Sequence, residues 1–119
     1  MAGTFTYADL SYLESMAMGS NDLIREMIQI FVDQLPEFTE GLALHLKDNQ
    51  LTALGALAHK AKSSVAVMGM NDLATDLKTL ELTSKSGENP EMYPVLVERF
   101  IEQVTVTGRE LSDYAKTLD

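Results

Sequence analysis

The sequence predicts an all-α fold: an antiparallel, up-and-down four-helix bundle with a short additional helix at the N-terminus. Four long segments carry apolar residues at spacings of three and four, which is typical of helices that bury one face. No segment alternates apolar and polar residues for long enough to form a useful strand. With 119 residues the chain can bury one core, so we expect a single domain over residues 1–119.

The first helix is expected to be short, extending from Thr6 to about Ala17. Thr6 and Asp9 have the spacing of a capping box, in which an acidic side chain stands three residues after the N-cap. Gly19 follows the last helical residue and should end the helix.

The second helix is expected over about 21–48, with Ser20 or Asn21 as its N-cap. Its apolar stripe comprises Ile24, Met27, Ile28, Phe31, Leu35, Phe38, Leu42 and Leu46. The stripe keeps its phase across Pro36, which favours one kinked helix over two helices that meet at Leu35. A tight junction at 48–49 then makes an antiparallel hairpin with the next helix.

The third helix, about residues 51–69, has two different faces. Its apolar stripe comprises Leu51, Leu54, Leu57, Ala58, Ala61, Val65 and Met68. His59 stands roughly 150° from the middle of that stripe and should face water. Its neighbours at helical spacing are small or polar: Thr52, Gly55, Ala56, Lys62, Ser63 and Ala66. Gly55 costs about 1 kcal/mol relative to alanine in a helix, and close approach by a partner would explain it.

Two further helices complete the bundle. Asn71 should cap a helix over about 72–86, and the loop SKSGENP follows it. The last helix is expected over roughly 90–117, beginning at Pro90, although Pro94 could instead be its first residue.

The composition excludes several function classes. A net charge of −9 repels a phosphate backbone and the sequence has no basic patch, so we expect no nucleic-acid partner. No apolar run approaches 18 residues and no signal-peptide pattern opens the chain, so we expect no membrane partner. The absence of cysteine excludes disulfides and thiolate metal sites. We therefore expect an acidic, monomeric, cytoplasmic domain without a metal of its own.

The two histidines of the chain are not equivalent. His45 lies at the edge of the second helix's stripe, where a partly buried histidine is ordinary. His59 has no acidic residue at i±3 or i±4 that could orient it, which disfavours acid–base catalysis. A single useful imidazole is also too little for a metal site. What remains is His59 as a nucleophile, because a neutral imidazole nitrogen can attack an activated phosphoryl group without a base of its own.

Two neighbours could assist such chemistry. Lys62, one turn after His59, could offset the charge of a phosphoryl group, and Ser63 could donate a hydrogen bond to it. A structural alternative also exists, since the hairpin should place Lys62 level with about Glu37, with which it could form a salt bridge.

The run His59-Lys60-Ala61-Lys62-Ser63, with Gly69 ten residues after the histidine and then Leu80-Glu81, resembles histidine-containing phosphotransfer (HPt) domains. The opening TYADLSYLE is similar to their short first helix, so the resemblance covers nearly the whole chain. It implies a helical bundle in which His59 carries the phosphoryl group through Nε2, Lys62 is the phosphate-side cation and Gly69 ends the helix. Ser63 stands where the family often has glycine.

The resemblance also implies what the domain does. It would be a phosphorelay intermediate that takes a phosphoryl group from a receiver-domain aspartyl phosphate and passes it to another receiver's aspartate. It would be a carrier rather than an enzyme, with Mg²⁺ on the receiver and a hybrid sensor kinase as a further candidate partner. The alternative from a different class is a non-catalytic interaction or scaffold module that has kept only the bundle.

A receiver needs a surface to bind as well as an imidazole. By the same hairpin register, the exposed flank of the second helix near His59 holds Gly41 and Leu44. Leu44 points away from its own helix's stripe, which is unusual for a leucine without a partner. We therefore expect a shallow docking patch made of Gly41, Leu44, Gly55, Ala56, Ser63 and Ala66.

Overall fold

The computed structural model describes residues 5–118, and these residues form five helices and no strand. The helices are α1 (Ser11–Ala17), α2 (Asn21–Lys47), α3 (Leu51–Val67), α4 (Asn71–Ser86) and α5 (Met92–Ala115). The first four residues and the last residue of the expected domain lie outside the described residues.

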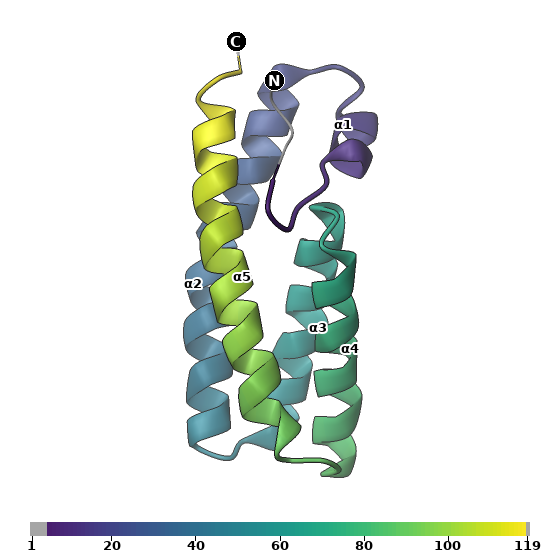
Figure 1. The fold of residues 1–119 in the computed structure, drawn as a ribbon, viewed down its shortest axis with the longest axis vertical. Helices are drawn as coiled ribbons and strands as arrows, with labels where there is room; N and C mark the ends of the chain where they lie inside the picture. Colours follow the sequence, from purple (N-terminus) through teal and green to yellow (C-terminus); the bar gives the residue numbers. More distant parts are fainter. Residues whose placement is uncertain (1–4, 119) are drawn as a thin grey trace.

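Helices α2 to α5 run alternately down and up the long axis of a body that measures 47 × 20 × 20 Å (Figure 1). Each of these helices packs on the next, and α5 closes the ring against α2. The predicted antiparallel four-helix bundle is confirmed.

The four helices of the bundle differ in length, and α1 fills the space that this difference leaves at one end. Helix α2 has 27 residues and α3 has 17, so α2 is longer by roughly 15 Å at 1.5 Å per residue. Helix α1 packs against α2. It lies beyond the upper ends of α3 and α4, in the space that these shorter helices leave (Figure 1). It thereby covers one end of the bundle.

The predicted stripes form the core. At its centre the rings of Phe38 on α2 and Phe100 on α5 meet edge to face, with centroids 6.5 Å apart. On α3 the fully buried stripe residues are Leu54, Ala58, Ala61 and Val65. Because these positions share one face of α3, the opposite face is left at the surface.

Two details of α2 agree with the sequence analysis. The helix is continuous through Pro36, although proline cannot donate the hydrogen bond that would tie it to the preceding turn. The Ser20 hydroxyl accepts a hydrogen bond from the backbone N–H of Leu23 at 3.1 Å and so caps the first turn.

The predicted cap of the first helix is wrong. Both the backbone N–H and the hydroxyl of Thr6 donate instead to the Glu110 carboxylate on α5, at 3.0 and 2.7 Å. The Asp9 carboxylate accepts from the backbone and hydroxyl of Ser11, at 2.9 and 2.7 Å, and these hydrogen bonds lower the pKa of Asp9. The N-terminal segment is thus tied to α5, which sequence spacing does not reveal.

The start of two later helices also differs from expectation. Helix α4 begins at Asn71 itself, so Met70 is the N-cap and no side chain caps the helix. Helix α5 begins at Met92, between the two prolines that were candidates for its start.

Gly69 follows α3 with a left-handed φ of 71°. The backbone N–H of Met70 reaches back to the carbonyl of Val65 at 3.1 Å, which closes the helix end. The N–H of Asp9 donates to the carbonyl of Met68 at 2.9 Å, so the N-terminal segment crosses this turn. A Cβ on Gly69 would stand 2.1 Å from the Asp9 carbonyl oxygen, and the close approach therefore requires glycine.

Candidate functional site

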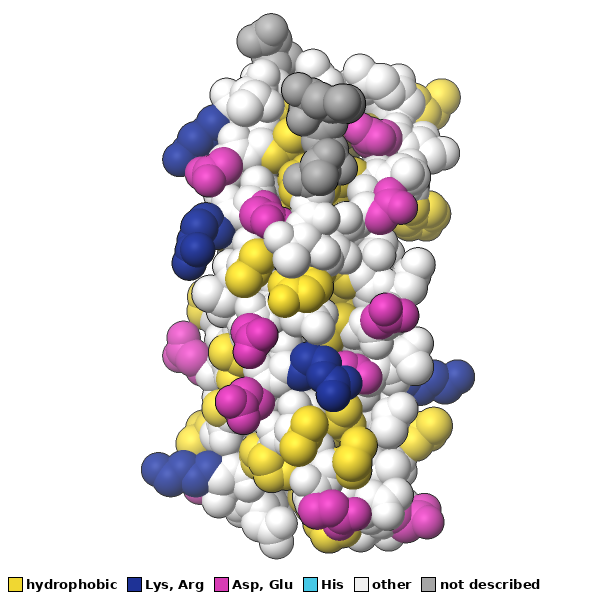
Figure 2. Space-filling model, in the orientation of Figure 1, with side chains coloured by type: hydrophobic (Ala, Val, Ile, Leu, Met, Phe, Trp, Pro, Cys, Tyr) yellow, Lys and Arg dark blue, Asp and Glu magenta, His cyan; other side chains and the backbone are white. Residues whose placement is uncertain are grey.

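His59 lies on the surface-facing side of α3, opposite the buried stripe. Its side chain is 62% exposed, so the imidazole is open to solvent and to a partner. No histidine is visible on the face drawn in Figure 2, where acidic side chains are scattered among isolated lysine and arginine side chains. The exposed imidazole therefore belongs to a different side of the bundle.

A carboxylate from the neighbouring helix orients the imidazole. Oε2 of Glu81, on α4, lies 3.0 Å from Nδ1 of His59, and the Glu81 side chain is only 12% exposed. No acidic residue stands at i±3 or i±4 of His59 on α3, as the sequence analysis stated, but an orienting acid comes from α4, which spacing along one helix cannot reveal. The Leu80-Glu81 pair had entered only as part of the family pattern, and the fold brings it to the site.

Gly55 allows α4 to pack close enough to α3 for Glu81 to reach His59. It is buried at the contact between α3 and α4, one turn before His59. A Cβ at this position would meet the Ser84 hydroxyl at 2.7 Å and the backbone oxygen of Glu81 at 3.3 Å. Its predicted place in an exposed docking patch is therefore wrong, since its missing side chain admits α4 and not an external partner.

Two lysines join the same carboxylate. Lys62 Nζ lies 3.7 Å from Oε1 of Glu81, and Lys85 Nζ lies 3.7 Å from Oε2. The hydrogen bond from His59 is the largest cause that lowers the pKa of Glu81; burial opposes it, and the charges of His59, Lys62 and Lys85 add to it. Glu81 is thus an ionised carboxylate that contacts three side chains, two from α3 and one from α4.

The alternative salt bridge between Lys62 and Glu37 does not form. Lys60 makes that contact, with its Nζ 2.8 Å from Oε2 of Glu37. The predicted register between α2 and α3 was nearly right, because a lysine of α3 does pair with Glu37. That lysine is Lys60, whereas the Lys62 side chain points toward α4. Lys62 therefore stays beside His59.

The other predicted site residues lie on α3 and α2. Ser63, Ala56 and Ala66 are exposed on α3. Gly41 is half-buried on α2, where a Cβ would meet a methyl of Leu57 at 2.5 Å. Leu44 is 54% exposed, as expected for a surface leucine.

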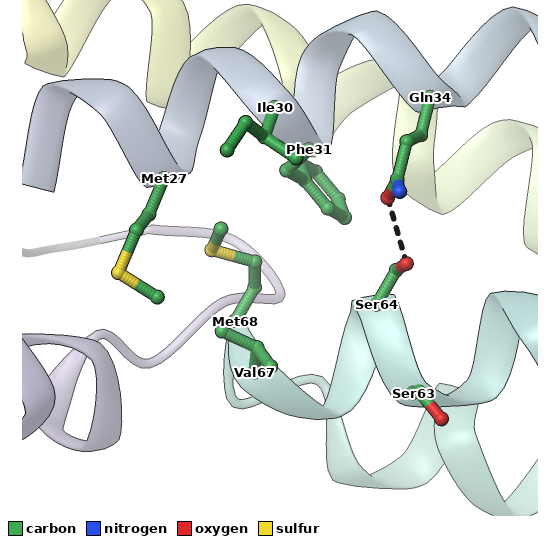
Figure 3. A pocket seen from close by; sticks show the side chains of 8 residues that line it. All are labelled: Met27, Ile30, Phe31, Gln34, Ser63, Ser64, Val67 and Met68. Carbon is green, nitrogen blue, oxygen red and sulfur yellow. Dashed lines mark hydrogen bonds between the residues drawn. The ribbon is translucent and has the colours of Figure 1, made fainter.

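An apolar groove between α2 and α3 begins one turn beyond His59 and was not predicted. Its volume is about 270 Å³. Figure 3 shows its lining residues, which are Met27, Ile30, Phe31, Gln34, Ser63, Ser64, Val67 and Met68. At one end the Ser64 hydroxyl and the Gln34 side-chain oxygen are 2.8 Å apart (Figure 3). Val67 and Ala66 also line a second hollow with Tyr12 of α1, so the apolar surface continues toward the first helix.

Three further observations on the described residues concern the second histidine, metal binding and membrane spans. His45 is half-buried at the rim of α2, as predicted. Among residues 5–118 no three histidine or acidic side chains gather in a way that could hold a metal ion. Within the same range, none of the helices combines the length and hydropathy needed to cross a lipid bilayer.

A four-helix bundle that presents a solvent-exposed histidine beside a lysine on one helix is the architecture of a histidine phosphotransfer module. The Hpt domain family model matches residues 26–112, and the chain belongs to this family. The structure is similar to the crystal structure of histidine-containing phosphotransfer protein B (HptB) from Pseudomonas aeruginosa PAO1. The two share 26% sequence identity and a TM-score of 0.72, over 94% of this chain and 90% of that one. No curated protein sequence matches the chain.

Membership of the family defines the general role of the chain. It takes part in phosphotransfer within two-component phosphorelays, and its partners are receiver domains of response regulators or sensor kinases.

Proposed function

We propose that His59 is the phosphoryl carrier of this Hpt domain. It would accept a phosphoryl group from the aspartyl phosphate of one receiver domain and pass it to the aspartate of another. The observation that carries the proposal is an imidazole that is 62% exposed and has its Nδ1 3.0 Å from a nearly buried carboxylate.

The contact with Glu81 selects the reacting nitrogen. A neutral imidazole whose Nδ1–H donates to a carboxylate has its lone pair on Nε2, which supports the assignment of Nε2 that the family resemblance implied. That lone pair attacks the phosphorus atom and forms the N–P bond, while the P–O bond to the receiver's aspartate breaks and its electron pair leaves with the carboxylate. No proton has to be removed. The ring gains positive charge, which Glu81 stabilises through the retained Nδ1–H.

Lys62 and Ser63 would act on the phosphoryl group once it is bound. Lys62, 28% exposed and beside the imidazole, offsets part of the added negative charge, and the exposed Ser63 hydroxyl can donate a hydrogen bond to it. Interactions between exposed charges are worth about 1 kcal/mol or less, so most of the rate acceleration must come from the partner. We propose that the receiver supplies it with Mg²⁺ and acidic groups, which makes this domain a carrier rather than an enzyme.

We propose that the receiver docks along the apolar surface between α1, α2 and α3. This surface begins at Ser63 next to the phosphoryl site and continues through Ile30 and Val67 to Tyr12 and Ala66. Ile30 and Tyr12 are 52% and 57% exposed, which is costly for an apolar surface that nothing ever covers. Ser63 and Ala66 from the predicted patch belong to this surface.

The test is transfer from a receiver domain that has been charged with radiolabelled acetyl phosphate. The domain should acquire a label that is labile in acid and stable in base, and His59→Gln should abolish it. His45→Gln is the matched control and should keep the label. Label retained in His59→Gln would reject His59 as the carrier, and a wild-type domain that accepts no label from a panel of receivers would favour the scaffold alternative.

A further inference from the structure

We infer that Lys85 on α4 is a second phosphate-side cation, which moves from Glu81 to the phosphoryl group when His59 is phosphorylated. The inference rests on the proposed function and adds a residue that the histidine–lysine motif does not contain. That motif lies wholly on α3, whereas Lys85 reaches the site from the neighbouring helix.

The geometry brings Lys85 to the imidazole through a shared oxygen. Oε2 of Glu81 is the atom that lies 3.0 Å from Nδ1 of His59, and the same atom lies 3.7 Å from Nζ of Lys85. Lys62 approaches the other oxygen, Oε1. The two ammonium groups therefore contact the two different oxygens of the carboxylate that orients the reacting ring.

Lys85 is also free to move. Its side chain is 65% exposed, against 28% for Lys62, and its separation of 3.7 Å from Glu81 is longer than a hydrogen bond. A flexible lysine in such a loose ion pair can turn toward a stronger anion at small cost. A phosphoryl group on Nε2 would be that anion, since it brings nearly two negative charges and three acceptor oxygens.

The charge of the site shows why one cation is not enough. Glu81, Lys62 and Lys85 together carry a net charge of about +1 before phosphorylation. A phosphoryl group near −2, on a ring that keeps its Nδ1–H and so carries about +1, changes this sum to about 0, whereas without Lys85 it would reach about −1. The surrounding protein has a net charge of −9 and repels a further anion, so the second lysine stabilises the phosphorylated state.

The other charged groups near the site are already engaged or lie to one side. On the side of α2, Lys60 is paired with Glu37 at 2.8 Å and Glu37 adds negative charge. On the side of α4, within the described part of the chain, Glu81 pairs with His59 and Lys62 of α3, and Lys85 pairs with Glu81 of its own helix. Lys85 is therefore the cation whose partner would change with the least disruption.

The experiment compares Lys85→Ala with Lys78→Ala. Lys78 is an exposed lysine two turns earlier on the same helix, about 10 Å away along its axis, and it makes no ion pair with any described residue. Both variants remove one positive charge from α4. An effect seen only in Lys85→Ala therefore arises from the position of Lys85 near the phosphoryl group and not from the change in net charge. Lys85→Arg keeps the charge and should restore wild-type behaviour.

Two readouts are measured on each variant. After chemical phosphorylation with potassium phosphoramidate, the phosphoryl pKa is read from the ³¹P chemical shift as a function of pH, and loss of a nearby cation should raise it. The equilibrium of transfer with a charged receiver domain should shift toward the receiver by about two- to fivefold in Lys85→Ala. A structural role for Lys85 would change thermal stability but not the phosphoryl pKa.

Equal phosphoryl pKa values and equal transfer equilibria in Lys85→Ala and Lys78→Ala would overturn the inference. That outcome differs from failure of the proposed function, in which wild-type His59 would not be labelled at all.

Discussion

Oε2 of Glu81, on α4, lies 3.0 Å from Nδ1 of His59, on α3. An exposed imidazole on a helix surface would otherwise rotate and exchange its proton between two nitrogens. A carboxylate that is 12% exposed is itself held in place, so it gives the ring one orientation and favours one tautomer. If His59 is the phosphoryl carrier, as proposed above, Glu81 is therefore a positioning residue that acts through His59.

Replacement of Glu81 by glutamine should slow transfer to His59 by about three- to tenfold. The amide oxygen can still accept from Nδ1–H, but it lacks the charge that stabilises the phosphorylated ring. The measurement is the rate at which label from a charged receiver appears on the domain. Glu37→Gln is the control, because Glu37 contacts Lys60 and makes no contact with the imidazole. Equal slowing in both variants would show that loss of surface charge alone is responsible.

Glu81 should also make the stability of the fold depend on pH in the acid range. Its pKa is lowered from 4.5, chiefly by the hydrogen bond from His59. A carboxyl whose folded-state pKa is lowered stabilises the fold above its unfolded value, and this contribution is lost as the pH falls through the folded-state pKa. The free energy of unfolding in urea, measured from pH 6 to below 4.5, should therefore fall less steeply in Glu81→Gln than in the wild type. Parallel curves would contradict this assignment.

The fold could be predicted from sequence because its helices carry their own signals. The stripe of α2 kept its phase through Pro36, and the structure has one helix there. The exposure of His59 followed from the same periodicity, since a residue opposite a buried stripe has to face outward.

The parts that sequence reasoning missed depend on contacts between helices. Gly55 was interpreted as an opening for a partner, and only the position of α4 shows that Ser84 and Glu81 occupy the space. Local spacing likewise could not pair Thr6 with Glu110, which is 104 residues away. Periodicity fixes the face on which a residue lies, but not which neighbouring helix covers that face or at what level.

Replacement of Gly55 by alanine should destabilise the bundle and disturb the site together. The added methyl would meet the Ser84 hydroxyl at 2.7 Å, and the cost of overpacking is partly offset by the better helix propensity of alanine. We expect a net loss of about 1 kcal/mol by urea denaturation, with slower labelling of His59 because α4 is pushed outward. Gly41→Ala is the matched control, since its methyl would meet only the flexible end of the Leu57 side chain and no atom of α4 within 4 Å. Unchanged labelling in Gly55→Ala would show that this contact does not position Glu81.

Replacement of Gly69 by alanine should cost far more than the same change at Gly87. Both glycines have a left-handed φ, 71° and 74°, so both substitutions carry a backbone penalty of about 1 kcal/mol. At Gly87 a Cβ would meet nothing within 4 Å, whereas at Gly69 it would stand 2.1 Å from the Asp9 carbonyl oxygen. We expect a further loss of roughly 1–3 kcal/mol in urea denaturation for Gly69→Ala. Equal losses would mean that the N-terminal segment does not pack on this turn in solution.

The proposed docking surface predicts that two exposed apolar residues of α2 differ in importance. Ile30, 52% exposed, lies in the groove that continues toward α1, whereas Leu44, 54% exposed, lies outside it. Ile30→Asp should weaken receiver binding and slow transfer, because it places an unpaired charge where an apolar contact is buried. Leu44→Asp adds the same charge at nearly the same exposure and should have little effect.

Binding is measured by titration of a receiver domain into the isotopically labelled protein, and the amide shifts should fall on α1, α2 and the second half of α3. Shifts centred on Leu44, with Leu44→Asp as the weaker binder, would place the receiver on the other side of His59.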